Sequence, residues 1–332
     1  MTRSFIIIVL LAIPFTTSAY SSSFAHIDSG YVSVDKNINV FYKRIGTGSQ
    51  IILVSFHRYL FDYFSRLSSP ERSIIFYDPR GRGRSSYIDD STKLSIKLDI
   101  EDIEKVRTHF TANPVSLLGF SEWGRVSLLY AKKYSANVKR VVVIGAPPLI
   151  PGTKYESEYM PDFSTVIIDS LLVLKLMKLI TSGFAQTNPV EFSILNWEVY
   201  SKPLLVYDSG FYNKFSKQHK EGFSNKNEWL QNINRYFKVR TKNDQAVELT
   251  WKSLKKLEIP VLIIHGRDDR NAPYGAGREW AIKLSNARLL TVFNACHLPW
   301  LESPEVVYSA VDRFLGGQWP ETALSISSKQ ND

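Results

Sequence analysis

Ser121 lies at an expected sharp turn between a strand and a helix. Such a turn would expose the serine side chain as a nucleophile. It follows the apolar stretch 115–120, and Gly119, two residues before it, gives the turn a residue without a side chain. Helix-forming sequence follows to residue 134. A serine hydroxyl is a weak nucleophile at neutral pH. Catalysis at such a turn therefore needs a histidine as base and a carboxylate that orients the histidine.

The base and the carboxylate are found near the end of the chain. Asp268 and Asp269 follow one apolar stretch, and His297 follows the next. The carboxyl ends of neighbouring parallel strands meet at one edge of a sheet, so these residues are expected to lie close to Ser121. The order serine, aspartate, histidine predicts hydrolysis in which Ser121 attacks, His297 relays the proton and an aspartate orients His297. This chemistry needs no metal ion or cofactor, and we expect neither.

The elements that position these residues are typical of a doubly wound α/β fold with a mostly parallel sheet. Short, fully apolar stretches alternate with helical segments such as 94–110, a pattern of parallel strands covered on both faces. The expected strands are residues 51–54, 73–77, 115–120, 138–144, 259–264 and 288–293, after an N-terminal hairpin over 31–45.

A long interruption of this alternation predicts an inserted cap domain. For about a hundred residues the sequence is mainly helical in pattern and rich in aromatic residues. We therefore expect the first part of the core at residues 20–147, a helical cap at 148–256, the second part of the core at 257–320 and a polar tail at 321–332.

The N-terminus has the pattern of a signal peptide. Arg3 precedes an apolar run from Phe5 to Phe15, and residues 17–19 offer small side chains for cleavage. The run is shorter than the ~20 residues of a membrane-spanning helix. We expect residues 1–19 to be cleaved and the protein to be exported, either periplasmic or secreted. An uncleaved N-terminal membrane anchor is the alternative.

The formal charge of the chain is +9, and it is unevenly spread. Residues 202–256 contain twelve Lys and Arg against five Asp and Glu, so this part of the cap could contact an acidic surface. A solvated basic face is the simpler interpretation. No nucleic-acid-binding motif accompanies the charge, so no nucleic-acid partner is expected. The one cysteine, Cys296, excludes an intrachain disulfide.

The chain resembles the α/β-hydrolase superfamily over nearly its whole exported length, and within it the proline iminopeptidase and valacyclovir-hydrolase-like branches. The segments that carry the resemblance are Asp78–Ser85, Leu118–Ser121, His265–Asp269 with Pro273, and His297–Glu302. The resemblance implies an α/β-hydrolase fold and a serine hydrolase whose substrate is a small ester or an N-terminal peptide bond. In this family the acid stands four residues after the histidine that ends the strand, which selects Asp269.

Backbone N–H groups and one cap residue complete the expected site. The N–H of Glu122, at the start of the helix after Ser121, would face the oxyanion, together with the N–H of Phe56 or Ser55. The cap dipeptide of Trp197 and Glu198 resembles the Trp-Glu of iminopeptidase caps. This resemblance implies that Glu198 binds the free amine of the substrate.

Three features depart from the pattern of the family. Ser55 and Phe56 stand where the family has a glycine-rich loop, Trp123 stands where it has a small residue, and Cys296 replaces the glycine before His297. Backbone N–H groups survive such changes, but bulky side chains restrict the backbone that aims them. A catalytically impaired binding protein with the α/β-hydrolase fold is therefore the alternative to an active serine hydrolase.

Overall fold

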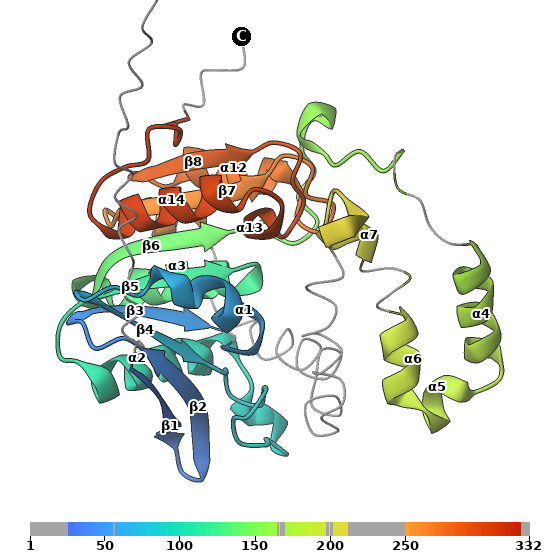
Figure 1. The fold of residues 1–332 in the computed structure, drawn as a ribbon, viewed down its shortest axis with the longest axis horizontal. Coiled ribbons are helices and arrows are strands. Elements are labelled where there is room, and N and C mark those ends of the chain that lie inside the picture. The colour runs from blue at the N-terminus through green and yellow to red at the C-terminus, as the bar shows by residue number, and fades with distance from the viewer. Residues whose placement is uncertain are drawn as a thin grey trace, which may run out of the picture.

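The computed structural model describes residues 26–55, 57–164, 166, 170–196, 199, 202–211 and 250–326. Within them, eight strands form one sheet in the order β1-β2-β4-β3-β5-β6-β7-β8 (Figure 1). The strands are β1 (Ile27–Asp35), β2 (Ile38–Ile45), β3 (Gln50–Ser55), β4 (Arg72–Tyr77), β5 (Val115–Phe120), β6 (Val138–Ile144), β7 (Val261–Gly266) and β8 (Ala287–Val292). The β1–β2 and β2–β4 pairs are antiparallel and the other pairs are parallel. The mostly parallel sheet expected from the sequence is confirmed.

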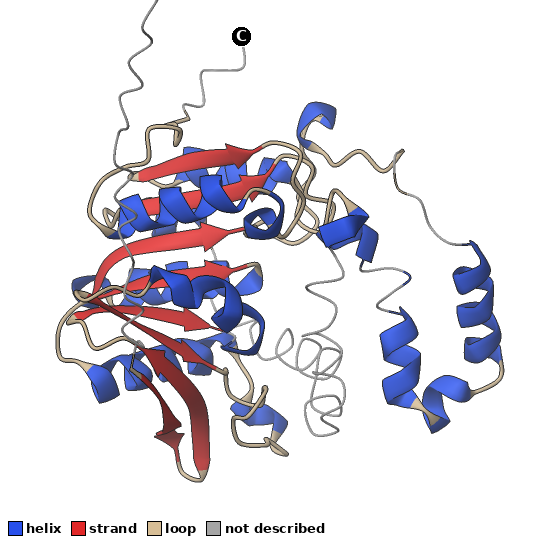
Figure 2. Ribbon diagram, in the orientation of Figure 1, coloured by secondary structure: helices blue, strands red, loops and turns tan. Residues whose placement is uncertain are grey.

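Helices cover both faces of the sheet (Figure 2). One face carries α2 (Ile96–Phe110), α3 (Glu122–Lys133) and α12 (Tyr274–Lys283), and the other carries α1 (His57–Phe64), α13 (Pro299–Glu302) and α14 (Pro304–Leu315). The side chains on each face form a separate buried cluster. Because both faces are covered, every residue of β7 is buried, and its sequence lacks the polar–apolar alternation of a half-exposed strand.

Local side chains determine where several elements begin and turn. The turn between β1 and β2 contains Asn37 with a φ of 62°, a conformation that asparagine tolerates better than most residues. Helix α2 begins at Ile96, because the Ser95 side chain accepts the N–H of Leu98 at 3.2 Å and caps the first turn. Short 3-10 turns lie at Ser65–Leu67, Ser91–Lys93, Ser135–Asn137, Ser157–Tyr159 and Ser209–Phe211.

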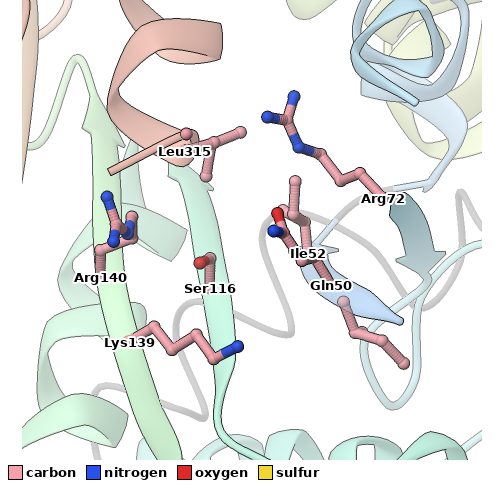
Figure 3. Close-up of a pocket in the computed structure, with 9 residues that line it drawn as sticks. Gln50, Ile52, Arg72, Ser116, Lys139, Arg140 and Leu315 are labelled. Carbon is pink, nitrogen blue, oxygen red and sulfur yellow. The ribbon is translucent and has the colours of Figure 1, made fainter. Parts of the chain in front are cut away.

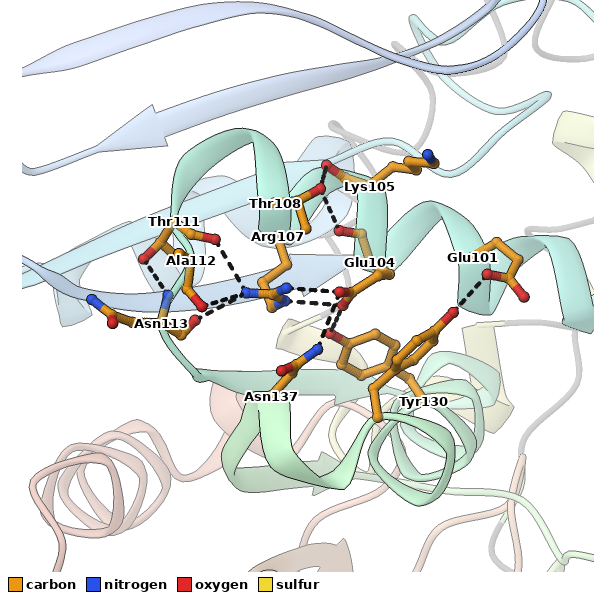
Figure 4. Close-up of polar contacts among 11 residues, drawn as sticks. Glu101, Glu104, Lys105, Arg107, Thr108, Thr111, Ala112, Asn113, Tyr130 and Asn137 are labelled. Atoms are coloured by element: carbon orange, nitrogen blue, oxygen red, sulfur yellow. Dashed lines mark hydrogen bonds and ion pairs between the residues drawn. The ribbon is translucent and has the colours of Figure 1, made fainter.

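A polar network joins α2 to α3, the helix that follows Ser121 (Figure 4). The carboxylate of Glu104 accepts two hydrogen bonds from the guanidinium of Arg107, at 2.9 and 2.7 Å. It also accepts the hydroxyl of Tyr130 at 2.6 Å and the amide of Asn137 at 3.1 Å. Donors from both helices and from the turn after α3 thus converge on one half-buried carboxylate, which fixes α3 against α2.

The loop after β4, which carries part of the family resemblance, is attached to α2 by a buried ion pair. Arg80 Nε and Nη2 donate to the two carboxylate oxygens of Asp102 at 2.6 and 2.5 Å, and both side chains are buried. Two parallel hydrogen bonds of this kind compensate the loss of water from both charges. This resemblance segment therefore attaches the loop after β4 to α2.

Between β6 and β7 the described residues form further helices. They are α4 (Ser170–Thr181), α5 (Phe184–Thr187), α6 (Pro189–Asn196), α7 (Lys202–Leu205) and α11 (Trp251–Leu254). Figure 1 shows α4, α5 and α6 as one group on the side where the parallel strands end. In the part of the chain that is described, no helix is both long enough and apolar enough to span a bilayer. The cap boundaries at 148 and 256 stay predictions, because residues 212–249 lie outside the described ranges.

Candidate active site

Ser121 lies in the turn between β5 and α3 with an uncommon backbone conformation. Its φ is 53° and its ψ is −129°. Such a conformation costs a residue with a side chain roughly 1–3 kcal/mol. The Ser121 N–H donates to the carbonyl of Ile144 on β6 at 2.8 Å, and the Ser121 carbonyl accepts from Gly124 on α3 at 2.9 Å. Strand β6 and helix α3 therefore hold the strained turn at Ser121, a strand–helix connection of the kind on which a serine nucleophile is expected.

Gly119 and Gly124 allow β5 and α3 to approach each other at this turn. A Cβ atom on Gly119 would lie 2.4 Å from the carbonyl oxygen of Trp123, and one on Gly124 would lie 2.6 Å from Val143 Cγ1. The family pattern has a small residue two positions after Ser121. In this chain the small residue is Gly124, three positions after Ser121. The indole of Trp123 is 2% exposed and belongs to the buried cluster on the α2 face, so the core accommodates it.

A buried carboxylate and a buried imidazole meet in the loops after β7 and β8. Asp269 Oδ2 lies 2.8 Å from His297 Nδ1. Asp269 Oδ1 accepts the N–H groups of Asn271 and Ala272 at 2.9 and 2.8 Å. Burial alone raises the pKa of Asp269, but the charges and hydrogen bonds of His297 and His265 hold this pKa well below its usual range. The ionised carboxylate places the imidazole proton on Nδ1 and leaves Nε2 as the basic nitrogen.

Gly145, directly after β6, brings this pair next to Ser121. Its φ is 59°, and a Cβ atom there would lie 3.0 Å from His297 Nδ1 and 3.5 Å from Asp269 Oδ2. The rings of His297 and of Phe120, the residue before Ser121, lie 4.8 Å apart between centroids. The structure therefore brings Ser121, Asp269 and His297 together at one edge of the sheet. Of the two neighbouring aspartates, Asp269 is the one that contacts His297.

A side chain that the sequence patterns did not indicate contacts the basic nitrogen of His297. Asn271 Nδ2 lies 3.0 Å from His297 Nε2. Because Nε2 carries no proton when Nδ1 donates to Asp269, the amide is the donor and Nε2 the acceptor. No hydrogen bond joins Ser121 Oγ to His297 among the described residues. The amide thus takes the place that the serine hydroxyl has in an assembled triad. Its position two residues after Asp269 was the only signal for it.

Cys296 connects the loop of His297 to the loop of Asp269. Its thiol donates to the carbonyl of Asp268, with Sγ and oxygen 2.9 Å apart. Burial raises the pKa of Cys296 to about 12, so the thiol keeps its proton. A Cβ atom on Gly266 would lie 2.1 Å from the Cys296 carbonyl oxygen, so Gly266 permits this close approach of the loops. Cys296 stands where the family pattern has glycine, and the contact between His297 and Asp269 is nevertheless formed.

Residues 46–304 match the sequence model of the alpha/beta hydrolase fold family. The chain belongs to the α/β-hydrolase family. It is 24% identical over 309 residues to a proline iminopeptidase of Saccharolobus solfataricus, covering 87% of this chain and 93% of that protein. It is 22% identical over 275 residues to a bifunctional esterase/perhydrolase of Acinetobacter calcoaceticus, covering 79% of this chain and 90% of that protein.

Solved structures agree with this assignment of the fold. The crystal structure of MGS-M2, an alpha/beta hydrolase enzyme from a Medee basin deep-sea metagenome library, is similar with a TM-score of 0.63 at 20% identity. The similarity covers 87% of this chain and 98% of that chain. Family membership confirms the fold and the hydrolase superfamily expected from the sequence, and the relatives are named for both ester and peptide hydrolysis.

In this α/β hydrolase, the loop of Asp269 and the loop of His297 both bind residues 203–208, which we name the anchor segment. Arg270, directly after Asp269, donates through Nη1 to the carbonyls of Pro203 and Val206 at 3.1 and 3.4 Å. From the other loop, the N–H of Leu298 donates to the carbonyl of Leu205 at 3.1 Å. The buried side chains of Leu205 and Val206 add apolar contact.

Glu302 makes the third attachment of the anchor segment. Its Oε1 accepts the N–H groups of Tyr207 and of Asp208, the latter at 3.1 Å. Its Oε2 accepts the N–H of Cys296 at 2.7 Å. Burial raises the pKa of Glu302 to about 7, although these three N–H groups act in the opposite direction. One carboxylate therefore connects the anchor segment with the residue before His297.

Some predicted features lie outside the described residues and stay predictions. They are Phe56, Glu198, the signal segment 1–19 and most of the basic stretch 202–256. Ser55 ends β3, and its buried hydroxyl lies 2.9 Å from the Tyr77 hydroxyl. Glu122 is the first residue of α3, where the backbone N–H groups point toward the N-terminal end of the helix. Its carboxylate pairs with Arg125.

Gly145→Ala is expected to remove most of the reactivity of Ser121. The added Cβ displaces the imidazole of His297, and a displacement of about 1 Å near a reacting group can cost ~10²-fold in rate. The measurement is the rate of labelling by a fluorophosphonate, with urea unfolding to follow stability. Gly152→Ala is the matched control, because Gly152 has a φ of 81° but no described atom within 4 Å of its added Cβ. Equal labelling of the two variants would contradict the expectation.

The free energy of unfolding is expected to fall between about pH 4.5 and pH 7 because of Glu302. Its pKa is raised from 4.5 to about 7 in the folded protein, so in this range the folded state keeps a proton that the unfolded chain has lost. The contribution is fully present below pH 4.5, is lost as the pH rises through 7, and amounts to at most ~3 kcal/mol.

Urea unfolding at pH 5 and pH 8 measures this contribution. The stability difference between the wild type and Glu302→Gln should favour the wild type more at pH 5 than at pH 8. Glu305→Gln, at an exposed residue of α14, is the control and should behave like the wild type at both values. A difference between the wild type and Glu302→Gln that does not change with pH would refute the assignment.

Proposed function

We propose that this α/β hydrolase cleaves a small ester or an N-terminal peptide bond through a covalent acyl-enzyme. Ser121 is the nucleophile, His297 is the base, and Asp269 orients His297 and stabilises its charge. The observation that carries the proposal is that the strained turn of Ser121 and the buried Asp269–His297 pair occupy the same edge of the sheet.

The proposal assigns each step of acyl transfer to a residue of the site. Ser121 Oγ attacks the substrate carbonyl while His297 Nε2 accepts the hydroxyl proton, which it then donates to the leaving alcohol or amine. A water molecule releases the acyl group by the same steps. The N–H of Glu122, with that of Phe56 or Ser55, binds the oxyanion, and one such donor is typically worth ~3 kcal/mol of barrier. The first step requires the Asn271 amide to leave Nε2.

The two substrate classes differ in the group that they present to the cap. A proline iminopeptidase and an esterase/perhydrolase are both relatives of the chain, which supports either class. An N-terminal peptide substrate brings an ammonium group, and Glu198 would bind it, whereas a simple ester brings no charge. Rates on free-amine anilides, N-acetylated anilides and simple esters distinguish these classes. A preference for the free amine supports the peptidase, and equal rates support the esterase.

A catalytically impaired binding protein is the second candidate, and the contact of Asn271 favours it. While the amide donates to His297 Nε2, that nitrogen cannot accept the proton of Ser121. If the amide stays there when a ligand binds, the site holds the ligand without cleaving it.

A fluorophosphonate is expected to label the wild-type protein at Ser121, because only an activated serine reacts readily with this class of probe. Mass spectrometry of the labelled peptide identifies the residue, and Ser121→Ala should show no label. Ser127→Ala is the matched control, since the hydroxyl of Ser127 is buried on α3 and donates to the Trp123 carbonyl at 2.8 Å. Failure of the wild type to label, or equal labelling of Ser121→Ala, would rule out the serine hydrolase.

Asn271→Ala is expected to increase the labelling rate severalfold. The amide N–H occupies the nitrogen that must accept the proton of Ser121, and the loss of a hydrogen bond of this kind is worth ~0.5–1.5 kcal/mol. Asn286→Ala is the control, because Asn286 donates to the Glu258 carbonyl at the far end of the strands. A loss of reactivity in Asn271→Ala would show instead that the amide assists catalysis.

A further inference from the structure

A small pocket opens at the edge of the sheet opposite to Ser121 (Figure 3). It lies among the first residues of β3, β4, β5 and β6 and the last residues of α14, and its volume is about 140 Å³. The polar residues that line it are Gln50, Arg72, Ser116, Lys139 and Arg140. The proposed catalytic residues all follow the carboxyl ends of strands, so this pocket is a separate place in the fold.

The lining is cationic. Arg72, Lys139 and Arg140 each carry a positive charge, and the described lining residues include no aspartate or glutamate. Gln50 and Ser116 add an amide and a hydroxyl, both of which can donate hydrogen bonds. Figure 3 shows these side chains around one common space. The pocket therefore offers positive charge and hydrogen-bond donors from four different strands.

Arg72 is held in the pocket with part of its guanidinium unsatisfied. The residue is 7% exposed, and its Nη1 donates to the carbonyl of Leu67 at 3.1 Å and to Asp312 Oδ1 at 2.6 Å. Its Nε is buried and has no hydrogen-bond partner among the described residues. A buried donor without an acceptor is costly, and native structures contain few of them. An acceptor inside the pocket would satisfy it.

Arg140 lines the same pocket as Arg72. Its Nη1 donates to the carbonyl of Phe314, at the end of α14. Burial, and in addition the positive charge of Arg72, lower the pKa of Arg140. Neither Arg140 nor Lys139 forms an ion pair with any residue that the structure describes. The fold thus brings like charges together, and among the residues that the structure describes Asp312, which pairs with Arg72, is the one carboxylate paired with them.

We propose that this pocket binds a small oxyanion such as inorganic phosphate or sulfate. Two or three cations would share the charge of the ion, and the donors of Arg72, Ser116 and Gln50 would point to its oxygens. The volume is well below the ~300 Å³ at which sites for drug-sized ligands begin, so a free ion fits better than a nucleotide. Binding to the folded chain alone stabilises it by mass action, independently of any hydrolysis at Ser121.

Thermal unfolding of the full chain tests the proposal. Melting temperatures are compared in sodium phosphate, sodium sulfate and sodium chloride at matched ionic strength and pH. At about ten times the dissociation constant, phosphate should raise the melting temperature by ~2–4 °C above chloride, and above that concentration the rise should grow with the logarithm of the phosphate concentration. Equilibrium dialysis with radioactive phosphate should give one ion per chain. An effect of sulfate equal to that of phosphate identifies the tetrahedral oxyanion as the shared ligand chemistry.

Three variants test whether the phosphate-dependent rise in melting temperature arises from binding in this pocket. Arg140→Gln should abolish the phosphate-dependent rise, and Lys139→Gln, at an exposed position that does not endanger folding, should weaken phosphate binding severalfold. Lys105→Gln removes the same charge from an exposed position on α2 and should keep the full response. The proposal is overturned if phosphate acts no differently from chloride. It is also overturned if Lys139→Gln responds like Lys105→Gln.

Discussion

The buried carboxylate of Asp269 is the constraint on which the site depends. A charge with no exposed surface is tolerated in a protein interior only when donors surround it. Here the donors are the imidazole of His297, two backbone N–H groups of its own loop, and His265, whose Nε2 lies 3.3 Å from the same carboxylate oxygen. Gly277 leaves room for His265, since a Cβ there would lie 2.5 Å from its ring nitrogen Nδ1. The need to satisfy one charge thus positions the loop of Asp269 and the loop of His297.

The strained turn of Ser121 depends on the packing of a larger part of the core. A residue held at an unfavourable φ relaxes unless its neighbours prevent it. Strand β6 fixes the Ser121 N–H, and the glycines at 119 and 124 let α3 lie close to β5. The network around Glu104 then holds α3 against α2. Burial of Trp123 in the same cluster explains how the turn forms with a large residue where a small one was expected.

The anchor segment is attached to both loops of the candidate site. Residues 203–208 receive hydrogen bonds from Arg270, next to the acid, and from Leu298, next to the base, and they donate to Glu302. Movement of this segment would therefore disturb the loop of Asp269 and the loop of His297. Because burial raises the pKa of Glu302 to about 7, the charge state of this attachment changes near neutral pH. Loops that carry catalytic residues on a rigid sheet are a common arrangement, and here the same loops also carry the anchor segment.

The sequence by itself determined the mostly parallel sheet, the turn at Ser121 and the order of serine, acid and base. These features rest on local patterns: apolar stretches for buried strands, a glycine before a serine, and loops after strand ends. Only the tertiary structure decided that Asn271 contacts His297, that Trp123 enters the core, that Glu302 joins two loops, and that cations from β4 and β6 share a pocket. These contacts join residues far apart in the chain, or depend on the direction of one side chain in a loop. Strand register and packing determine these long-range contacts and side-chain directions. Register and packing leave no periodic pattern in the sequence.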